Sequence, residues 1–426
     1  MSETPANSKP PASPEASETS EHAVPSAATG KLVVLMVTAF MDMVGMLMIL
    51  PLMPFYATKL GAGGLVVGLL VSSFSVAQLV SAPLWGRVSD RYGRRPALMV
   101  GLFASAIAYV VFAYADQLWL LFLSRLIQGA GGGTVSVIQA YVADATKPDD
   151  RAKSLGWLSA ATNAGVAIGP VLGTWVLPLG EHAPGLFAAA LCVINMGFAW
   201  RYLVESRTLG SAAEKKAVPR TSREAVLRVV THPNEPSSRL IFIYGISIGA
   251  FQGCTSILAL FLALRFGVTE KTIGYFFVYI GVLSVVTRGF LLERVLNRFG
   301  EARLSRYGLV LLAVGLVGVT LSQNLVALAI AVGLWPLGTA FTFPSVTAML
   351  TRVIGSHERG LYMGVQQTFG GISRVAFPTL FGFAYQYMGV QSPFLISAAL
   401  VLGTLLLGRD LEKYAPRKIR SVAASS

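Results

Sequence analysis

Long apolar runs alternate with short polar segments along most of the chain. Runs of about twenty apolar residues recur from position 31 onward. A helix of that length crosses the hydrocarbon core of a bilayer, and a helix satisfies its own backbone hydrogen bonds in lipid. The pattern predicts an all-α integral membrane protein with twelve transmembrane helices, at 32–54, 65–86, 97–115, 118–142, 154–176, 184–204, 239–264, 272–292, 305–322, 325–350, 362–386 and 392–409.

The predicted spans form two groups of six. This division predicts an N-terminal half at 31–204, a cytoplasmic linker at 205–238 and a C-terminal half at 239–410. Residues 1–30 are rich in Pro, Ser, Ala and Glu and predict a disordered tail. They lack the basic and apolar regions of a signal peptide. Residues 411–426 are assigned to a cytoplasmic tail, and 222–232 predicts a short basic helix at the inner membrane surface.

Composition agrees with this interpretation. Hydrophobic residues make up 54% of the chain and charged residues 13%, and the mean hydropathy is +0.62. A soluble chain of 426 residues would form two or three domains, but a soluble chain would not carry these apolar runs. The two cysteines, Cys192 and Cys254, lie inside apolar runs and show neither disulfide nor metal-binding spacing.

Positive charge is distributed unevenly between the two sides of the predicted membrane domain. Most of the 34 Lys and Arg residues fall on the side that holds both termini, whereas Lys59, Arg265 and Lys271 fall on the other. The positive-inside rule therefore predicts a multi-pass protein of the inner (plasma) membrane with both termini in the cytoplasm. The net charge of +13 then faces anionic lipid headgroups, so we expect the lipid bilayer and no nucleic acid as a partner.

The two halves share a weak repeat. Residues 151–170 and 359–378 align without gaps at an offset of 208, which pairs Arg151 with Arg359, Gly156 with Gly364 and Pro170 with Pro378. Parallel repeats of this kind are typical of transporters whose halves rock around a site near the membrane midplane.

Four motifs can be compared with known families. They are GRVSDRYGRRP at 86–96, RLIQG at 125–129, GVAIGPVLGT at 165–174, and DMVG at 42–45 followed by Pro51 and Pro54. Over 31–410 the chain resembles the major facilitator superfamily, and within it the twelve-span drug:proton antiporters of the tetracycline-efflux-like branch. The first motif matches the superfamily loop G-x-x-x-D-R-x-G-R-R, and the third matches the antiporter motif G-x-x-x-G-P-x-x-G-G, except that Thr174 replaces the last glycine.

The resemblance implies roles for two of these motifs. The gating loop comprises Gly86, Asp90, Arg91, Gly93, Arg94 and Arg95. Its aspartate would pair with the arginines and with the positive N-terminus of a helix in the other half, for which span eleven is the candidate, and so latch the inner gate. The antiporter motif, Gly165, Gly169, Pro170 and Gly173, would seal the cavity against leak. The alternatives are a loop that only sets topology, and small residues that only pack helices.

Two charged residues deep in the spans are candidates for proton coupling. Asp42 is the only acidic residue deep in a predicted span, and the repeat places Ala250 opposite it in the second half. An intramembrane carboxylate is costly and faces a cavity or a partner, so we expect Asp42 to carry the proton or sense its binding. Arg125 cannot be neutralised, and the resemblance implies that it also takes part. Alternatively, each residue only bonds neighbouring helices together.

The predicted substrate cavity draws on several spans. Met46 and Ile49 share the face of Asp42 in a Met-rich helix, and such soft side chains suit a promiscuous binding wall. Gln128 shares the face of Arg125. Further candidates are Asn163, Gln252, Trp335, Gln366 and Arg374. Each uncharged member could equally form a helix–helix hydrogen bond, whereas Arg374, at the centre of span eleven, could pair with an anionic or zwitterionic substrate.

The sequence thus predicts proton-driven efflux of small amphipathic organic compounds or drugs, by a monomer. One alternative is a proton-coupled transporter of a specific metabolite or sugar, and another is a non-transporting receptor or scaffold. No set of residues suits an enzyme. The four histidines, His22, His182, His232 and His357, lie in the tail or loops, so we expect neither a metal site nor a cofactor.

Overall fold

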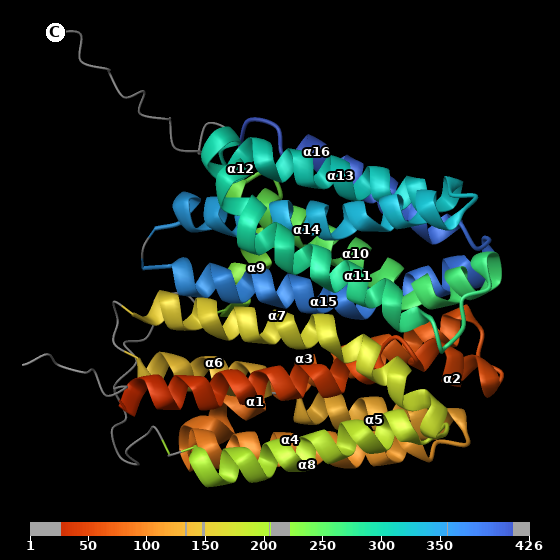
Figure 1. The fold of residues 1–426 in the computed structure, drawn as a ribbon. Coiled ribbons are helices and arrows are strands. Elements are labelled where there is room, and N and C mark those ends of the chain that lie inside the picture. Colours follow the sequence, from red (N-terminus) through yellow and green to blue (C-terminus); the bar gives the residue numbers. More distant parts are fainter. Residues whose placement is uncertain are drawn as a thin grey trace, which may run out of the picture.

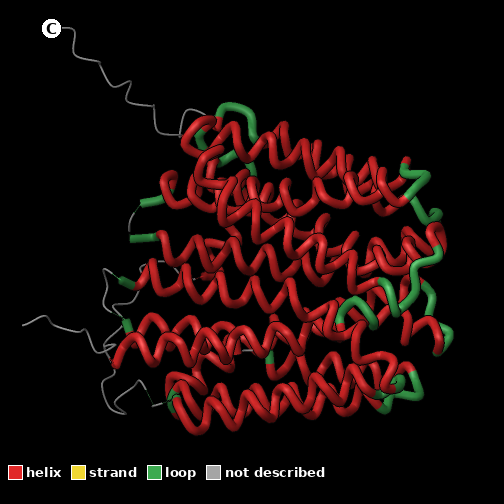
Figure 2. Tube along the Cα trace, in the orientation of Figure 1, coloured by secondary structure: helices red, strands yellow, loops and turns green. Residues whose placement is uncertain are grey.

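The computed structural model describes residues 27–132, 134–146, 150–203, 205, 222–355 and 357–411. These residues form helices joined by short loops (Figure 2). Of the tails predicted at 1–30 and 411–426, residues 1–26 and 412–426 lie outside the described residues, as do linker residues 206–221. Residues 27–30 form the first turn of a helix, so the prediction of a disordered tail is wrong for them. The N-terminal helices are α1 (Ala27–Ile49), α2 (Met53–Lys59), α3 (Gly64–Tyr92), α4 (Arg94–Ala113), α5 (Leu118–Gly131), α6 (Thr134–Ala145), α7 (Arg151–Val176) and α8 (Ala183–Tyr202), with a 3₁₀ turn at Leu177–Leu179.

The second part of the chain has a similar set of helices. They are α9 (Ser222–Thr231), α10 (Pro236–Phe266), α11 (Ile273–Val286), a π-helical turn (Thr287–Leu291), α12 (Leu292–Phe299), α13 (Glu301–Leu321), α14 (Leu325–Val353), α15 (Arg359–Tyr387) and α16 (Ser392–Leu407). In Figure 1, α1–α8 form one bundle and α10–α16 form a second bundle beside it, with their long axes running in nearly the same direction.

Each of the twelve predicted spans corresponds to a described helix or to consecutive helices. Among the described residues, nine helical stretches are long and apolar enough to cross a membrane. The three that fall short are the α5–α6 pair, which is interrupted at Gly132, the 16-residue α16, and α15, which carries several polar residues. Each of the three is less apolar or shorter than a simple membrane-spanning helix for its own reason. In α15 the reason is its polar residues, of which Gln367 and Arg374 line the cavity described below.

The charged segment at 86–96 is mostly helical, not the loop that its charges suggested. Helix α3 continues to Tyr92, and α4 begins at Arg94. Only Gly93, with φ +104°, separates them. A side chain would be strained at that φ value, so a single glycine makes the whole turn. The first predicted span is also divided, because α1 ends at Ile49 and α2 restarts with Pro54 in its first turn.

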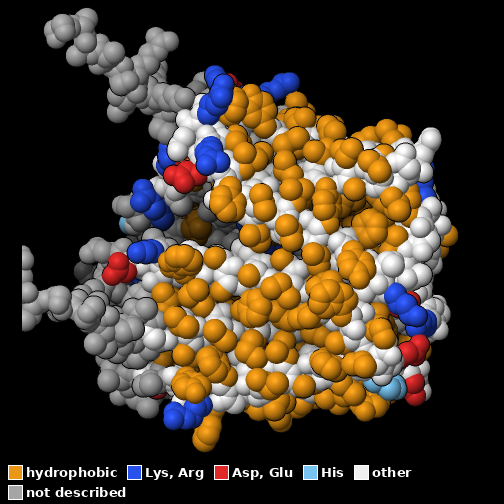
Figure 3. Space-filling view, viewed as in Figure 1, with side chains coloured by type: hydrophobic (Ala, Val, Ile, Leu, Met, Phe, Trp, Pro, Cys, Tyr) orange, Lys and Arg blue, Asp and Glu red, His pale blue; other side chains and the backbone are white. Residues whose placement is uncertain are grey.

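Apolar side chains cover the outer surface of both bundles. Figure 3 shows a broad hydrophobic face, with charged side chains gathered at its two ends. Large exposed residues such as Val80, Leu264 and Trp200 contribute to this surface, each 67–68% exposed. An apolar surface of this extent indicates contact with lipid.

The linker contains the predicted short helix. In α9, Ala225 and Val229 are buried in the hydrophobic core of the C-terminal bundle, and the helix lies against α10 and α15. The Arg228 guanidinium holds the carboxylate of Glu235, just before α10, at 3.0–3.2 Å. Helix α9 is therefore attached to the C-terminal bundle.

Candidate functional site

A central cavity of about 530 Å³ lies between the two bundles, within the range of small-molecule sites. Its walls come from α3, from the α5–α6 junction and α6, and from α15. The lining residues are Ser75, Gln78, Leu79, Ala82, Pro83, Gly132, Val135, Ser136, Gln139, Gly364, Gln367, Thr368, Gly371 and Arg374. In α3 and α15 most of these residues lie in the half of the helix nearer the α3–α4 turn. The cavity therefore lies toward that end, which we call the basic end.

At the other end, which we call the closed end, α3 and α15 are in direct contact. Ser72 Oγ donates to the Val375 carbonyl at 2.6 Å, and Thr379 Oγ1 donates to Ser72 Oγ at 2.8 Å. A Cβ atom on Gly68 would lie 2.1 Å from the Pro378 carbonyl oxygen. The two helices therefore approach to backbone contact, which only glycine permits there.

An ion-pair cluster also joins the bundles at the closed end. Lys59 Nζ, at the end of α2, lies 2.9 Å from Glu181 and 3.2 Å from Glu270, the latter in the C-terminal bundle. The hydrogen bond from Lys59 lowers the pKa of Glu181 below its ordinary value. Exposed pairs of this kind contribute little each, so helix packing dominates closure.

Asp42 lies in a small polar chamber. Its side chain is only 6% exposed, and its Oδ2 accepts a hydrogen bond from Thr134 Oγ1 at 2.9 Å. The chamber measures about 30 Å³, which is room for a water molecule. Met46 and Gln128 also line it. The α5–α6 break directly precedes Thr134, so this interruption places the hydroxyl donor against α1.

The chamber and the central cavity share part of a wall. Gln78, Gly132 and Val135 line both spaces, and Gln78 Nε2 lies 3.3 Å from the Gly132 carbonyl oxygen. These three residues therefore form a wall that the Asp42 chamber shares with the larger cavity.

Arg125 is buried in α5 without an ion pair to Asp42. The side chain is 2% exposed, and its Nε and Nη2 atoms have no hydrogen-bond partner among the described residues. Tyr109 lies close enough to both charged groups to interact electrostatically with each. Its hydroxyl accepts from Gln128 Nε2 at 2.7 Å. The hydrogen bond that ties α1 to this region comes from Thr134, not from Arg125.

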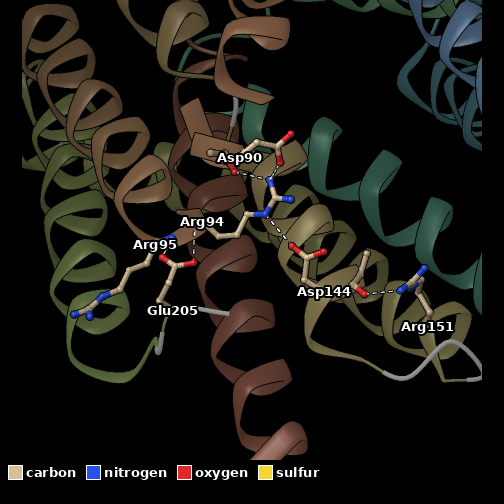
Figure 4. Close-up of polar contacts among 8 residues, drawn as sticks. Asp90, Arg94, Arg95, Asp144, Arg151 and Glu205 are labelled. Carbon is tan, nitrogen blue, oxygen red and sulfur yellow. Dashed lines mark hydrogen bonds and ion pairs between the residues drawn. The ribbon is translucent and has the colours of Figure 1, made fainter. Parts of the chain in front are cut away.

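Figure 4 shows how Arg94 of the gating loop connects α3 to α6. Its Nη1 lies 3.0 Å from Asp90 Oδ1 and donates to Ser89 Oγ at 2.7 Å, while its Nε donates to Asp144 Oδ2 at 2.9 Å. Arg91 lies over the Tyr92 ring at 5.4 Å. These contacts lie within the N-terminal bundle, and the predicted latch to span eleven stays a prediction.

The carboxylate of Glu205, which follows the end of α8 at Tyr202, caps the start of α4. Glu205 Oε1 accepts from the Arg94 amide at 2.9 Å, and Oε2 accepts from the Arg95 amide at 3.0 Å (Figure 4). A Cβ atom on Gly93 would lie 2.5 Å from Glu205 Oε2. Gly93 is thus required by its φ angle, and a side chain there would also displace this carboxylate, whereas a Cβ on Gly86 would meet nothing within 4 Å. The Arg95 guanidinium also bonds the Trp200 carbonyl.

The three glycines of the antiporter motif pack α7 against α1. Added Cβ atoms on Gly165, Gly169 and Gly173 would lie 2.6, 2.8 and 2.4 Å from backbone oxygens of α1. Pro170 and Thr174 face the other bundle instead. A Cβ on Gly274 of α11 would lie 2.6 Å from the Pro170 carbonyl and 2.1 Å from Thr174 Oγ1.

The structure distributes the other predicted cavity residues among several places. Arg374 lines the central cavity. Asn163 lines a side pocket of about 130 Å³ that shares Val135 and Gln139 with it. Gln252 lines a void of about 20 Å³ between the bundles nearer the closed end.

Three predicted cavity residues are corrected, because they lie in packed interiors. Ile49 is fully buried in a core of the N-terminal bundle. Trp335 is fully buried in the C-terminal core, with its ring 6.1 Å from that of Phe394. Gln366 is fully buried and bonds Thr347 at 3.3 Å. Helix-to-helix packing explains each of them.

Sequence reasoning missed two amide groups of the cavity wall, those of Gln78 and Gln139. Both are polar residues within apolar runs. Their positions inside the spans are a signal, but an uncharged amide inside a span is also a common helix-packing group. Among the described residues, no group of His, Cys, Asp or Glu is placed to hold a metal ion.

Comparison with known proteins identifies the family. The model of the Major Facilitator Superfamily matches residues 35–322 and 240–423. The chain belongs to this superfamily. It is therefore a multi-pass membrane transporter and not an enzyme. The match at 240–423 covers the C-terminal half by itself.

Several relatives of the chain are drug-resistance proteins by name. Multidrug resistance protein 2 of Bacillus subtilis (strain 168) is 25% identical over 374 residues, covering 87% of this chain and 92% of the relative. Tetracycline resistance protein, class B, of Escherichia coli is 25% identical over 362 residues, covering 83% and 88%.

Solved structures of superfamily members confirm the fold. The human organic anion transporter MFSD10 matches with a TM-score of 0.67 at 24% identity, covering 90% of this chain and 99% of that one. A bacterial homologue of the human lysosomal transporter Spinster, in an inward-facing and unoccupied conformation, matches with a TM-score of 0.72 at 14% identity, covering 93% and 100%.

Proposed function

We propose that this transporter exports small amphipathic organic compounds or drugs in exchange for protons, by alternating access. The observation that carries the proposal is the wall shared by the Asp42 chamber and the central cavity. A group that binds protons and a cavity that binds substrate influence each other most directly when the same residues contact both. The names of the relatives support efflux of drugs.

In this proposal the protein lies in the plasma membrane, and its basic end faces the cytoplasm. The asymmetry of Lys and Arg supports that orientation. The cavity then opens toward the cytoplasm while the closed end separates it from the outside, which is the state expected to receive a substrate for export. The protein acts as a monomer, because one chain supplies both bundles.

The proton reaches the Asp42 carboxylate when the cavity faces outward and leaves when it faces inward. Thr134 donates to the ionised carboxylate, so protonation of Asp42 weakens the bond that holds α6 to α1. Because α6 also lines the cavity, the protonation state is communicated to the substrate site. Arg125 has two free donor atoms and takes part in another state of the cycle, where they meet Asp42 or water.

The gating loop and the antiporter motif have different roles in the transport cycle. When the bundles close at the basic end, Asp90 lies against the N-terminus of α15 and latches the inner gate. The antiporter glycines keep α7 tight against α1, and so prevent a leak of protons along that seam.

Proton movement triggered by compounds tests the proposal. Inverted vesicles are loaded with acid, candidate drugs are added, and luminal pH is followed for wild type and Asp42→Asn. We expect alkalinisation with wild type and none with the variant. Asp116→Asn, an equal change at an exposed residue outside the spans, should behave as wild type. Equal responses from Asp42→Asn and wild type would remove Asp42 from coupling.

The second candidate function is proton-coupled transport of one polar metabolite. The amide side chains of Gln78, Gln139 and Gln367 in the cavity wall favour it. Failure of a broad drug panel to move protons in folded protein, with a response to sugars or amino acids, would support this alternative.

A further inference from the structure

Arg374 carries the only charged side chain among the described residues that line the central cavity. It stands near the middle of α15 and is half-buried. No hydrogen bond or ion pair involves it within the described part of the chain. Other arginines near α15 are paired, since Arg352 bonds Glu301 at 2.7 Å and Arg359 bonds the Thr351 carbonyl at 2.9 Å. A guanidinium inside a membrane domain requires an anion or water as its partner.

The surroundings of Arg374 supply neutral donors and no competing acid. Gln367 lies seven residues earlier on the same face of α15, and Gln78 and Gln139 face the space from α3 and α6. The hydrogen bonds of Gln78 and Gln367 are long, at 3.3 and 3.4 Å, so both amides are available to a ligand. The carboxylate of Asp42 lies in its separate chamber.

We propose that the central cavity selects organic anions, and that the acidic group of the substrate pairs with Arg374 while the glutamine amides donate to its remaining oxygens. The inference rests on the proposed transport function and names the substrate class of the same site. A cationic drug would meet an uncompensated positive charge there, which is a repulsive element of specificity. Arg374 thereby acts as the residue that determines charge preference.

Three fluorescent ligands with one scaffold test the charge preference. Dansylglycine is an anion, dansylglycinamide is neutral, and dansylethylenediamine carries a cationic amine. Their dissociation constants for the purified full-length protein are measured from dansyl fluorescence. We expect dansylglycine to bind about tenfold or more tightly than dansylglycinamide, as suits a hydrogen-bonded charge pair, and dansylethylenediamine to bind most weakly.

Variants separate the guanidinium from the rest of the wall. Arg374→Gln should lose the preference for dansylglycine while binding dansylglycinamide as wild type does, which also shows that the cavity is folded. Arg374→Lys should restore part of the preference, because the charge remains. Arg288→Gln removes an arginine from the π-helical turn, which does not line the cavity, and should leave the preference unchanged.

The outcomes distinguish this inference from the proposed function. Equal binding of the three ligands by wild type, or an unchanged preference in Arg374→Gln, would overturn the anion site. If the anion site is rejected but cationic dyes still drive proton movement in vesicles, the proposal of proton-coupled efflux is supported without an anion site. Binding of dansylglycine that depends on Arg374, in protein that moves no protons with any compound, would support the anion site and reject proton exchange.

Discussion

Substitution of Gly68 by alanine should trap the transporter with its closed end open. The added Cβ would lie 2.1 Å from the Pro378 carbonyl oxygen, and both partners are helix backbone. Neither can rotate away, so α3 and α15 must separate by roughly 1.3 Å or more to reach ordinary contact. The clash exists only while these helix ends touch, and rocking of the two bundles removes it.

The size of the effect follows from the cost of overpacking. An extra methyl group in a tightly packed interface costs about 1–3 kcal/mol, which corresponds to a shift of about 5- to 150-fold in a two-state equilibrium. Alanine also favours helix over glycine by about 0.5–1 kcal/mol, but that gain applies equally to both states of the transporter. Transport should slow, because return to the closed state becomes the difficult step.

Accessibility of a cysteine reports the state directly. Val71 is half-buried and lines the small void between the bundles near the closed end, so Val71→Cys introduces a thiol that becomes more accessible when this end opens. Native Cys192 and Cys254 are 1% and 0% exposed and add little background. We expect Gly68→Ala to increase labelling by a membrane-impermeant maleimide at least fivefold. Gly197→Ala, whose Cβ would meet nothing within 4 Å, should not change it.

Unchanged labelling in well-folded Gly68→Ala protein would refute the reasoning. It would mean that α3 and α15 absorb the methyl group by a local shift, and that their contact does not decide which state is populated. The same test applies to Gly382→Ala on α15, where the Cβ would lie 2.4 Å from the Gly64 carbonyl oxygen.

Three further changes test local features. Glu205→Ala removes the acceptor for the first amides of α4, including that of Arg94, and should lower stability by about 0.5–2 kcal/mol, measured as a lower melting temperature that Glu205→Gln partly avoids. Asp90→Asn should insert normally but transport more slowly, and a wild-type transport rate would count against the latch. Thr134→Val should reduce proton-coupled transport, because it removes the hydrogen-bond donor to Asp42, whereas Thr134→Ser should retain most of the transport. A transport rate for Thr134→Val equal to that of Thr134→Ser would show that the hydrogen bond is dispensable.

Much of the fold follows from the periodicity of apolar residues, because each span must bury its backbone polar groups in a helix. The positions of the breaks follow less directly. The charges at Arg87 and Asp90 suggested a loop, yet they lie on α3, because charged side chains can extend into water from a helix end. Only Gly93, with its positive φ and the carboxylate of Glu205 beside it, shows where the helix stops.

The candidate site was partly visible in the sequence for an energetic reason. Asp42 and Arg374 stood out because a charge inside an apolar run is costly without a function or partner. Gln78 did not stand out, because a neutral amide satisfies itself easily between helices. Trp335 was wrongly predicted to line the cavity and is fully buried in the core, since a large aromatic side chain fills a core as readily as it lines a cavity.

The departure from the antiporter motif has a structural explanation in the other bundle. The motif glycines at 165, 169 and 173 face α1, where backbone oxygens leave no room for a side chain. Position 174 faces α11 instead. At this contact the small residue is Gly274 of α11, and the residue on α7 is Thr174. The Thr174 hydroxyl donates to the Pro170 carbonyl at 3.2 Å within its own helix, so it needs no partner across the interface. Because one of two facing positions must be small for the helices to meet, a threonine on α7 and a glycine on α11 satisfy the same requirement as the reverse arrangement. Gly274 is therefore part of the seal at the closed end, together with Gly68.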